Sequence, residues 1–254
     1  MSGSLKPGSV RSAAHLPGVA FLASAALALS GCGGGGSTAV QGGTAYGLAN
    51  ALGKLVTQGF SVSVTLSGSL PINGVATTVT GSGTLTYGAG ASGTFNGAAA
   101  LLQDQTLSGS VTAAGQTDPY TTSVTDYYAT GNDAFLGEVN NTANGAEYDV
   151  AQSPIVYPAT VVDGSSGALG TVSRYTDSTM SVALGTAQVS YSVKTDSTSS
   201  GSVIVELKEL VYDTQNRLLE TDLTDYALST NDVLSLVSAS VQTTNNGTLT
   251  ATAQ

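Results

Sequence analysis

Histidine, cysteine and tryptophan are almost missing from this chain of 254 residues. It has one histidine, His15, one cysteine, Cys32, and no tryptophan. Everything after residue 32 therefore lacks imidazole and thiol groups, which excludes Ser-His-Asp and Cys-His catalysis, zinc sites built from His or Cys, and disulfide bonds there. The sequence also contains no nucleophile elbow, phosphate-binding loop or EF-hand loop. We expect no cofactor.

Basic residues are scarce as well. The chain has 7 Lys and Arg against 17 Asp and Glu, and all the acids follow residue 32. Because Lys6 and Arg11 precede residue 32, residues 32–254 have five basic side chains against seventeen acidic ones, which gives a net charge of −12. Such a surface repels nucleic acids and anionic lipid headgroups, so we expect no nucleic-acid partner. Cations and basic partners remain compatible with it.

No apolar run is long enough for a membrane-spanning helix, which needs ~20 residues. The apolar segment Val19–Leu29 is shorter and follows Lys6 and Arg11. This order is typical of a secretory signal peptide. It ends at Leu29-Ser30-Gly31-Cys32, after which a tract of glycines begins.

These last four residues resemble the processing site of bacterial lipoproteins. Leu29 stands three positions before Cys32, and small residues, Ser30 and Gly31, separate them. The resemblance implies cleavage before Cys32 and attachment of diacylglycerol and fatty acyl chains such as palmitate, where each buried methylene contributes ~0.8 kcal/mol to membrane binding. Gly33 rather than Asp follows, which in this family implies outer-membrane sorting, facing the periplasm or the cell surface. The alternative is an ordinary thiol behind a conventional signal peptide.

Composition divides the chain into four segments. Residues 1–31 are the expected signal peptide, and the Gly-rich residues 32–43 read as a flexible tether. Residues 44–150 and 151–254 are expected to form two β units, or one continuous domain. One short helix is predicted over residues 45–57, because Leu48, Leu52, Leu55 and Val56 share one face.

From Phe60 onward the hydrophobic period is two, which is typical of half-buried strands. Asn73-Gly74 predicts a tight hairpin turn with Ile72 opposite Val75, a register that extends to Phe60 opposite Tyr87. Further strand-like segments alternate with Asp, Asn, Gly and Ser turns. We predict a mostly β protein, an antiparallel meander forming a sandwich or open barrel. A transmembrane barrel would need apolar outward positions, whereas these are mostly Ser, Thr and Ala.

An internal repeat supports two related β units. Thr125-Asp126-Tyr127 recurs 99 residues later as Thr224-Asp225-Tyr226, and Asn132-Asp133 recurs as Asn231-Asp232. The alternative is chance similarity in a chain rich in Thr, Ser, Gly and Ala. We expect the boundary within the stretch 140–170, which reads as irregular.

The repeated polar residues are weak candidates for an acidic site: Asp126, Asn132, Asp133, Asp225, Asn231 and Asp232. Their oxygens are of the kind that calcium prefers, but the sequence shows no compact ligand loop. Asn and Asp are also the residues that tolerate tight turns, and this interpretation is the stronger one. We therefore assign no metal site.

A second predicted hairpin carries four acids. Residues 213–217 form its turn, with Leu207 opposite Leu223 and Lys208 opposite Asp222. Glu206, Glu209, Glu220 and Asp222 would then be neighbours. A pair of carboxylates can hydrolyse a glycan, whereas four acids beside a lysine more often form a solvated face.

Three functional hypotheses follow. The preferred one is a non-enzymatic lipoprotein of the cell envelope that binds a protein or polymer and contacts the membrane through its N-terminal lipid. The second is a carrier of a lipid or another apolar ligand inside a β cavity. The third is a carboxylate-based glycan hydrolase.

Overall fold

The computed structural model describes residues 43–254 except 73 and 143–144. Its elements are, in order, α1 (Leu48–Gln58), β1 (Phe60–Ile72), β2 (Val75–Tyr87), β3 (Ala91–Phe95), β4 (Ala98–Ala113), β5 (Gln116–Ala129), β6 (Phe135–Thr142), β7 (Gly145–Ile155), β8 (Ser166–Tyr175), β9 (Ala183–Thr195), β10 (Ser202–Asp213), β11 (Leu218–Ser229), β12 (Leu234–Thr243) and β13 (Thr248–Ala253). The predicted processing site at residues 29–32 lies outside the described residues, as does the tether except residue 43.

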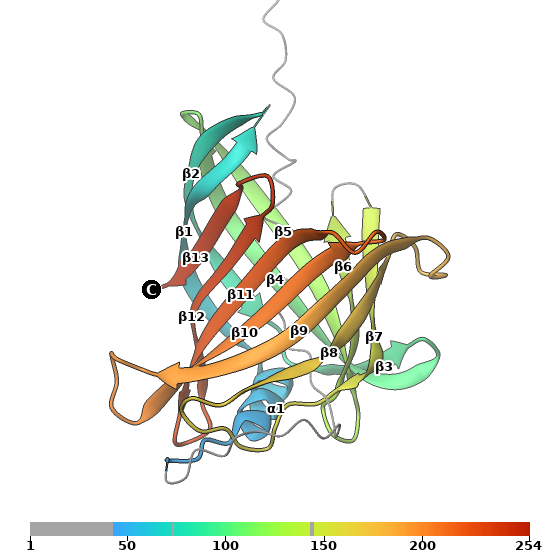
Figure 1. Ribbon diagram of the computed structural model, residues 1–254, viewed down its shortest axis with the longest axis vertical. Helices are drawn as coiled ribbons and strands as arrows, with labels where there is room; N and C mark the ends of the chain where they lie inside the picture. The colour runs from blue at the N-terminus through green and yellow to red at the C-terminus, as the bar shows by residue number, and fades with distance from the viewer. Residues whose placement is uncertain (1–42, 73, 143–144) are drawn as a thin grey trace, which may run out of the picture.

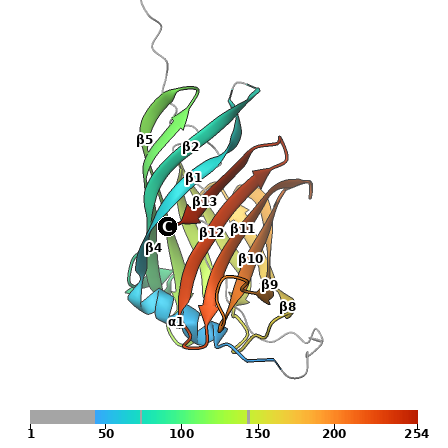
Figure 2. The ribbon, with the colours of Figure 1, turned by 90° about the vertical axis from the view of Figure 1, so that its left-hand side faces the viewer.

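The strands form one closed antiparallel barrel. Each strand from β4 to β13 pairs with the next, β13 also pairs with β1, and β2 pairs with both β1 and β4 (Figures 1 and 2). Twelve strands thus close the barrel, and β3 is an extra strand hydrogen-bonded to β4. The prediction of a mostly antiparallel β protein with one short helix is confirmed. The sheet closes fully on itself, which leaves none of the twelve strands with a free edge.

The register predicted for the first hairpin is confirmed along its whole length. Ile72 pairs with Val75, and the pairing continues without a shift to Phe60 and Tyr87. The rings of this last pair stack, with centroids 4.5 Å apart. The turn residues and the alternation of apolar and hydroxyl side chains were sufficient to predict this register, because a one-residue slip would have turned serines and threonines inward.

The register predicted for the second hairpin is wrong by one residue over most of its length. Leu207 pairs with Thr224 and Lys208 with Leu223, because the register shifts between Val211 and Tyr212. A bulge places an extra residue on one strand and moves every later pair by one position. As a result Glu209, not Lys208, lies opposite Asp222.

The stretch 140–170 is more regular than predicted. It contains β7 and the first half of β8. β7 pairs with β6 from Gly145 opposite Thr142 to Ile155 opposite Phe135. The irregular part is limited to residues 156–165, where Val161 forms an isolated bridge with Tyr46. The expected boundary at residue 150 falls inside β7, and the strands before and after it belong to the same closed sheet.

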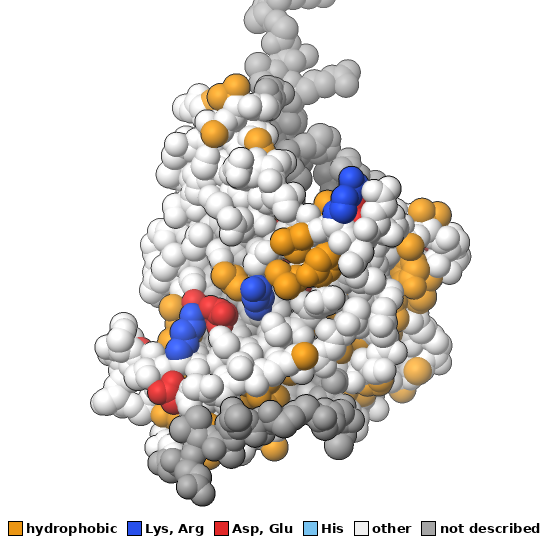
Figure 3. Space-filling view, in the orientation of Figure 1, with side chains coloured by type: hydrophobic (Ala, Val, Ile, Leu, Met, Phe, Trp, Pro, Cys, Tyr) orange, Lys and Arg blue, Asp and Glu red, His pale blue; other side chains and the backbone are white. Residues whose placement is uncertain are grey.

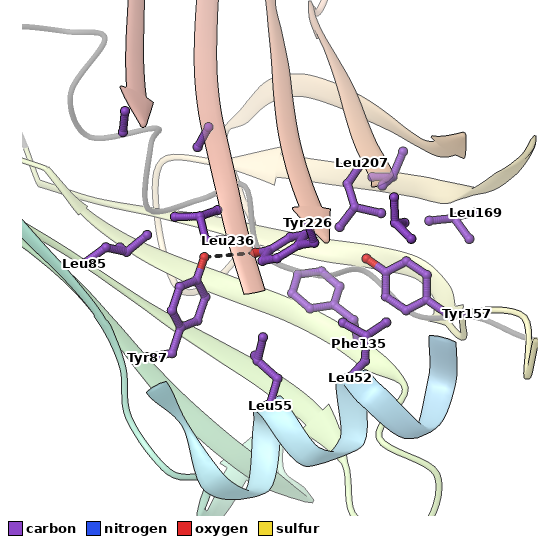
Figure 4. Close-up of a cluster of buried hydrophobic side chains, with 14 of the residues drawn as sticks. Leu52, Leu55, Leu85, Tyr87, Phe135, Tyr157, Leu169, Leu207, Tyr226 and Leu236 are labelled. Carbon is purple, nitrogen blue, oxygen red and sulfur yellow. Dashed lines mark hydrogen bonds between the residues drawn. The ribbon is translucent and has the colours of Figure 1, made fainter. Parts of the chain in front are cut away.

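The helix α1 covers one end of the barrel (Figures 1 and 2). Its predicted apolar face is buried, with Leu48, Leu52, Leu55 and Val56 each at most 6% exposed. Leu52 and Leu55 point toward aromatic and aliphatic side chains of the strands (Figure 4). Near its C-terminal end, Gln103 Nε2 donates to the carbonyl oxygen of Leu55 at 2.9 Å, which satisfies one of the terminal carbonyls that a helix leaves unpaired.

No helix in the described part of the chain combines the length and the apolar character that a membrane crossing requires.

Candidate functional site

Acidic side chains line part of the barrel interior. On β11, Glu220 and Asp222 alternate on the same face as the fully buried Tyr226 and Leu228, and they are 8% and 2% exposed. On β10, Glu209 lies on the same face as the buried Leu207 and Val211. We call the following residues the carboxyl cluster: Glu138, Glu147, Asp149, Glu209, Glu220 and Asp222, together with Arg174.

Strand pairing brings the cluster together. Glu138 pairs with Asp149 across β6 and β7, and Asp149 pairs with Arg174 across β7 and β8. Arg174 Nε donates to Asp149 Oδ2 at 3.0 Å and Arg174 Nη2 donates to Glu147 Oε2 at 2.9 Å. On the other side of β9, Glu209 pairs with Asp222 across β10 and β11. Arg174 also interacts electrostatically with Glu209, so the two groups of acids share one cation.

The cluster lies toward the end of the barrel that α1 leaves uncovered. α1 contacts the turns that follow β5 and β11, whereas Glu147 and Glu220 are close in sequence to the β6–β7 and β10–β11 turns at the other end (Figure 1). The side chain of Glu147 is 28% exposed, against 6% for Arg174 and 8% for Asp149. The cluster is therefore buried but reaches solvent at Glu147.

Burial raises the pKa of most of these carboxyls. The pKa of Glu209 rises to about 8 and that of Glu220 to about 7. The pKa of Asp149 rises to about 6, because burial outweighs the opposing charge and hydrogen bond of Arg174. The pKa values of Asp222 and Glu138 are also raised by burial and by neighbouring carboxylates. One guanidinium cannot neutralise six acids, so several carboxyls keep their protons near neutral pH.

Several buried polar atoms of the site lack hydrogen-bond partners among the described residues. In that part of the chain Oδ1 of Asp149 and the hydroxyl of Tyr157 have no partner, and Oε1 of Glu220 and Oδ1 of Asp222 have none beyond the hydrogen bond that their two carboxyls share. Tyr157 is 2% exposed and lies beside Phe135 in the hydrophobic cluster near α1 (Figure 4), where its hydroxyl interacts electrostatically with Tyr226, Asp126 and Glu209. Leaving a buried acceptor unpaired costs about 1–3 kcal/mol, so this arrangement provides sites for donors supplied from outside the barrel wall.

Asp126 is the one of the six repeated polar residues that adjoins the cluster. It is fully buried and pairs with Glu138 across β5 and β6. Its Oδ2 accepts hydrogen bonds from the Tyr128 hydroxyl, at 3.0 Å, and from Gln105 Nε2. Burial raises its pKa to about 7, although both hydrogen bonds act in the opposite direction.

The two repeated Asn-Asp pairs lie in the turns beside α1. Asp133 and Asp232 both adopt positive φ angles, of 52° and 56°. Asp232 Oδ1 accepts from the backbone N–H of Gly47 at 3.0 Å, and its Oδ2 accepts from Asn50 Nδ2 at 2.7 Å. These contacts agree with the turn interpretation of Asn132, Asp133, Asn231 and Asp232.

Asp225 lies apart from those turns, beside Lys194 at 3.8 Å. The structure therefore does not bring the six candidates into one site. Among the described residues, no group of three or more His, Cys, Asp or Glu side chains is arranged to hold a metal ion.

The four acids of the second hairpin separate onto two faces. Glu206 faces outward, where Lys194 Nζ donates to its Oε2 at 2.7 Å. Glu209, Glu220 and Asp222 face inward. The expectation of a solvated face is wrong for Glu220 and Asp222, and Glu206 cannot form a catalytic pair with Glu220. The sequence signal for the burial of Glu220 and Asp222 is their spacing: they stand an even number of residues before Tyr226 and Leu228 and therefore lie on the same face of β11.

Sequence reasoning missed four members of the cluster, which are Glu138, Glu147, Asp149 and Arg174. Asp149 lies in the stretch that we predicted to be irregular, so no face could be assigned to it. Arg174 lies on β8 and Glu138 on β6, and local periodicity does not show that the sheet places Arg174 near Glu209 of β10.

Comparison of the chain with protein-family models, with curated proteins and with solved structures gave no match. The functional assignment therefore depends on the geometry of the barrel and its interior.

Proposed function

We propose that this protein is a lipid-anchored component of the cell envelope whose barrel is a non-enzymatic binding module. The observation that supports it best is the polarity of the barrel wall. In the first hairpin Ser61, Ser63 and Thr65 point outward, whereas Val64, Leu66 and Leu85 are buried inside. A hydroxyl-covered outer face is suited to water, and the groups available for a ligand are then in the interior.

The outer face seen in Figure 3 is mostly uncharged and polar, with scattered apolar and charged side chains. Leu218 and Leu219 are the exposed apolar residues beside the β10–β11 turn, at 40% and 41%. A continuous apolar band of the height needed to match a bilayer would require such residues at most outward positions. The first hairpin has serine and threonine there instead.

The proposed anchor is the lipid on Cys32, and the tether of residues 33–43 allows the barrel to sit ~17–20 Å from it on average. Attachment to the outer membrane, on its periplasmic or outer side, follows from Gly33 in the position after the modified cysteine. The excess of acidic residues disfavours nucleic acid as a partner.

Binding is favoured over transport of an apolar ligand by the way the interior is filled. Near α1, Leu52 and Leu55 belong with Tyr128 and Phe135 to one continuous hydrophobic cluster. The unpaired acceptors of the carboxyl cluster lie farther along the interior. A ligand that supplies hydrogen-bond donors therefore fits the interior better than an apolar one.

The anchor is tested by expressing wild type and Cys32→Ser in a diderm bacterium with an alkyne-labelled palmitate. We expect label and outer-membrane fractionation for wild type and neither for Cys32→Ser. An unlabelled wild-type protein, or one that keeps residues 1–31, would contradict the anchor.

The non-enzymatic role is tested separately. Purified wild type is incubated with envelope glycans, and released reducing ends are measured. We expect no release. Release that disappears in Glu209→Gln and persists in Glu206→Gln would show that the barrel is a hydrolase.

A further inference from the structure

We propose that the carboxyl cluster is a binding site for an aliphatic polyamine. This inference rests on the proposed role as a binding module and names its ligand class. It is carried by the placement of six acidic side chains and one arginine on the inner wall, and by buried acceptors that have no donor.

The first argument is charge. Five basic side chains lie in the described part of the chain, and Arg174 is the one that faces the carboxyl cluster. Lys194 and Arg217 are on the outside, 52% and 72% exposed. The cluster therefore exceeds its own cation by up to five negative charges. A ligand with several positive charges can replace the protons that otherwise neutralise these groups.

The second argument is hydrogen bonding. Arg174 satisfies Oδ2 of Asp149 and Oε2 of Glu147 and leaves Oδ1 of Asp149 without a donor. Among the described residues, Oε1 of Glu220 and Oδ1 of Asp222 have no donor other than the proton that their two carboxyls share. An ammonium group donates three hydrogen bonds and accepts none, which matches a set made almost wholly of acceptors.

The third argument is the apolar surface between the acids. Across the neighbouring strands Glu209 pairs with Val189, and Asp222 pairs with Val241. Glu220 pairs with Val211. All three valines are buried on the inner wall. Acids spaced by valines suit a chain in which ammonium groups alternate with methylene groups.

One further observation favours an organic cation over a metal ion. No group of metal-ligating side chains among the described residues has a suitable arrangement. The partly exposed Glu147 marks the side from which the cluster meets solvent.

The test uses the mature lipoprotein purified from membranes and reconstituted in nanodiscs of zwitterionic lipid. Spermidine is titrated calorimetrically at pH 7.5 in two buffers of different ionisation enthalpy, at fixed ionic strength. We expect saturable binding with release of protons, since ammonium groups displace protons from the carboxyls. Pentane-1,5-diol is the uncharged control and MgCl2 the inorganic one.

Three variants locate the site. Glu209→Gln and Asp222→Asn should each weaken spermidine binding at least tenfold. Glu206→Gln, which removes a carboxylate from the outer face of the same strand, should leave it unchanged. Circular dichroism confirms folding, and Glu209→Gln alone suffices if Asp222→Asn does not fold.

Absence of spermidine binding to wild type would overturn the proposal, and so would proton release without dependence on Glu209. Equal weakening by Glu206→Gln, or equal binding of Mg²⁺, would show attraction to the acidic surface only and would also overturn it. These outcomes leave the palmitate and glycan results untouched, so a failure of the ligand class is distinguishable from a failure of the proposed function.

Discussion

The backbone N–H of Gly47 donates a 3.0 Å hydrogen bond to Oδ1 of Asp232, a residue 185 positions later in the chain. The contact fastens the start of α1 to the β11–β12 turn, and Asn50 and Lys54 reinforce it through Asp232 Oδ2 and the carbonyl oxygens of Asn231 and Asp232. A turn from the other half of the chain thus supplies the acceptor for the backbone N–H group at the start of the helix.

We expect Asp232→Ala to lower the free energy of unfolding by about 1–2 kcal/mol, because the helix loses its N-terminal acceptor. Urea denaturation followed by circular dichroism measures the change. Asn231→Ala is the matched control, since its side chain is exposed and Lys54 contacts its backbone carbonyl. An equal loss in both variants would contradict a specific role for the carboxylate.

The stability of the barrel should fall as pH rises from about 5 to about 8.5. Asp126, Glu209 and Glu220 have pKa values of about 7, 8 and 7 in the folded barrel, against about 4 in an unfolded chain. The folded state therefore binds more protons across this range, and raising the pH favours unfolding. Urea denaturation at pH 5, 7 and 8.5 measures the trend.

Glu209→Gln should flatten that pH dependence, because the amide removes one of the groups that must ionise in the interior. We expect a gain on the order of 2 kcal/mol at pH 8.5 and little change at pH 5. Glu206→Gln provides the control on the outer face. A parallel shift of the whole profile in Glu209→Gln would argue for a packing effect instead.

Leu52→Ala should cost about 2–5 kcal/mol of stability, because it leaves a cavity where α1 packs on the barrel. Leu52 is 1% exposed and belongs to the hydrophobic cluster of the interior. The exposed Gln58 of the same helix is the control, and Gln58→Ala should change stability by less than about 0.5 kcal/mol. Thermal unfolding of both variants measures the two changes in stability, and equal changes would contradict a packing role for Leu52.

Gly83→Ala should destabilise the barrel by about 1–3 kcal/mol, because a Cβ there would lie 2.5 Å from the carbonyl oxygen of Ser108 on β4. The strands approach closely at this position. Gly131→Ala, in a turn where an added Cβ meets nothing within 4 Å, should be nearly neutral. A neutral Gly83→Ala variant would mean that β2 and β4 can separate without cost.

Sequence patterns predicted the local structure well where one face of a strand is apolar throughout. The β1–β2 register and the buried face of α1 followed from alternation, from Asn73-Gly74 and from the spacing of Leu48, Leu52 and Leu55. The second hairpin could not be placed as well, because the bulge between Val211 and Tyr212 leaves no mark in its composition.

The candidate site was harder to predict than the strands. Charged residues are normally assigned to the solvent face, and Glu220 and Asp222 were so assigned despite sharing parity with Tyr226. Arg174 on β8 and Glu209 on β10 interact across the intervening strand β9, which requires the faces and registers of three strands to be known together. Such long-range placement has no counterpart in local periodicity.

Closure of the barrel also sets the order of events during folding. Val64 of β1 pairs with Ala253 of β13, so the last pairing of the cylinder joins residues almost 190 positions apart. Contacts this distant in sequence form slowly. Until β13 forms, one edge of β1 has no strand partner, so a chaperone that shields that edge would speed closure of the barrel.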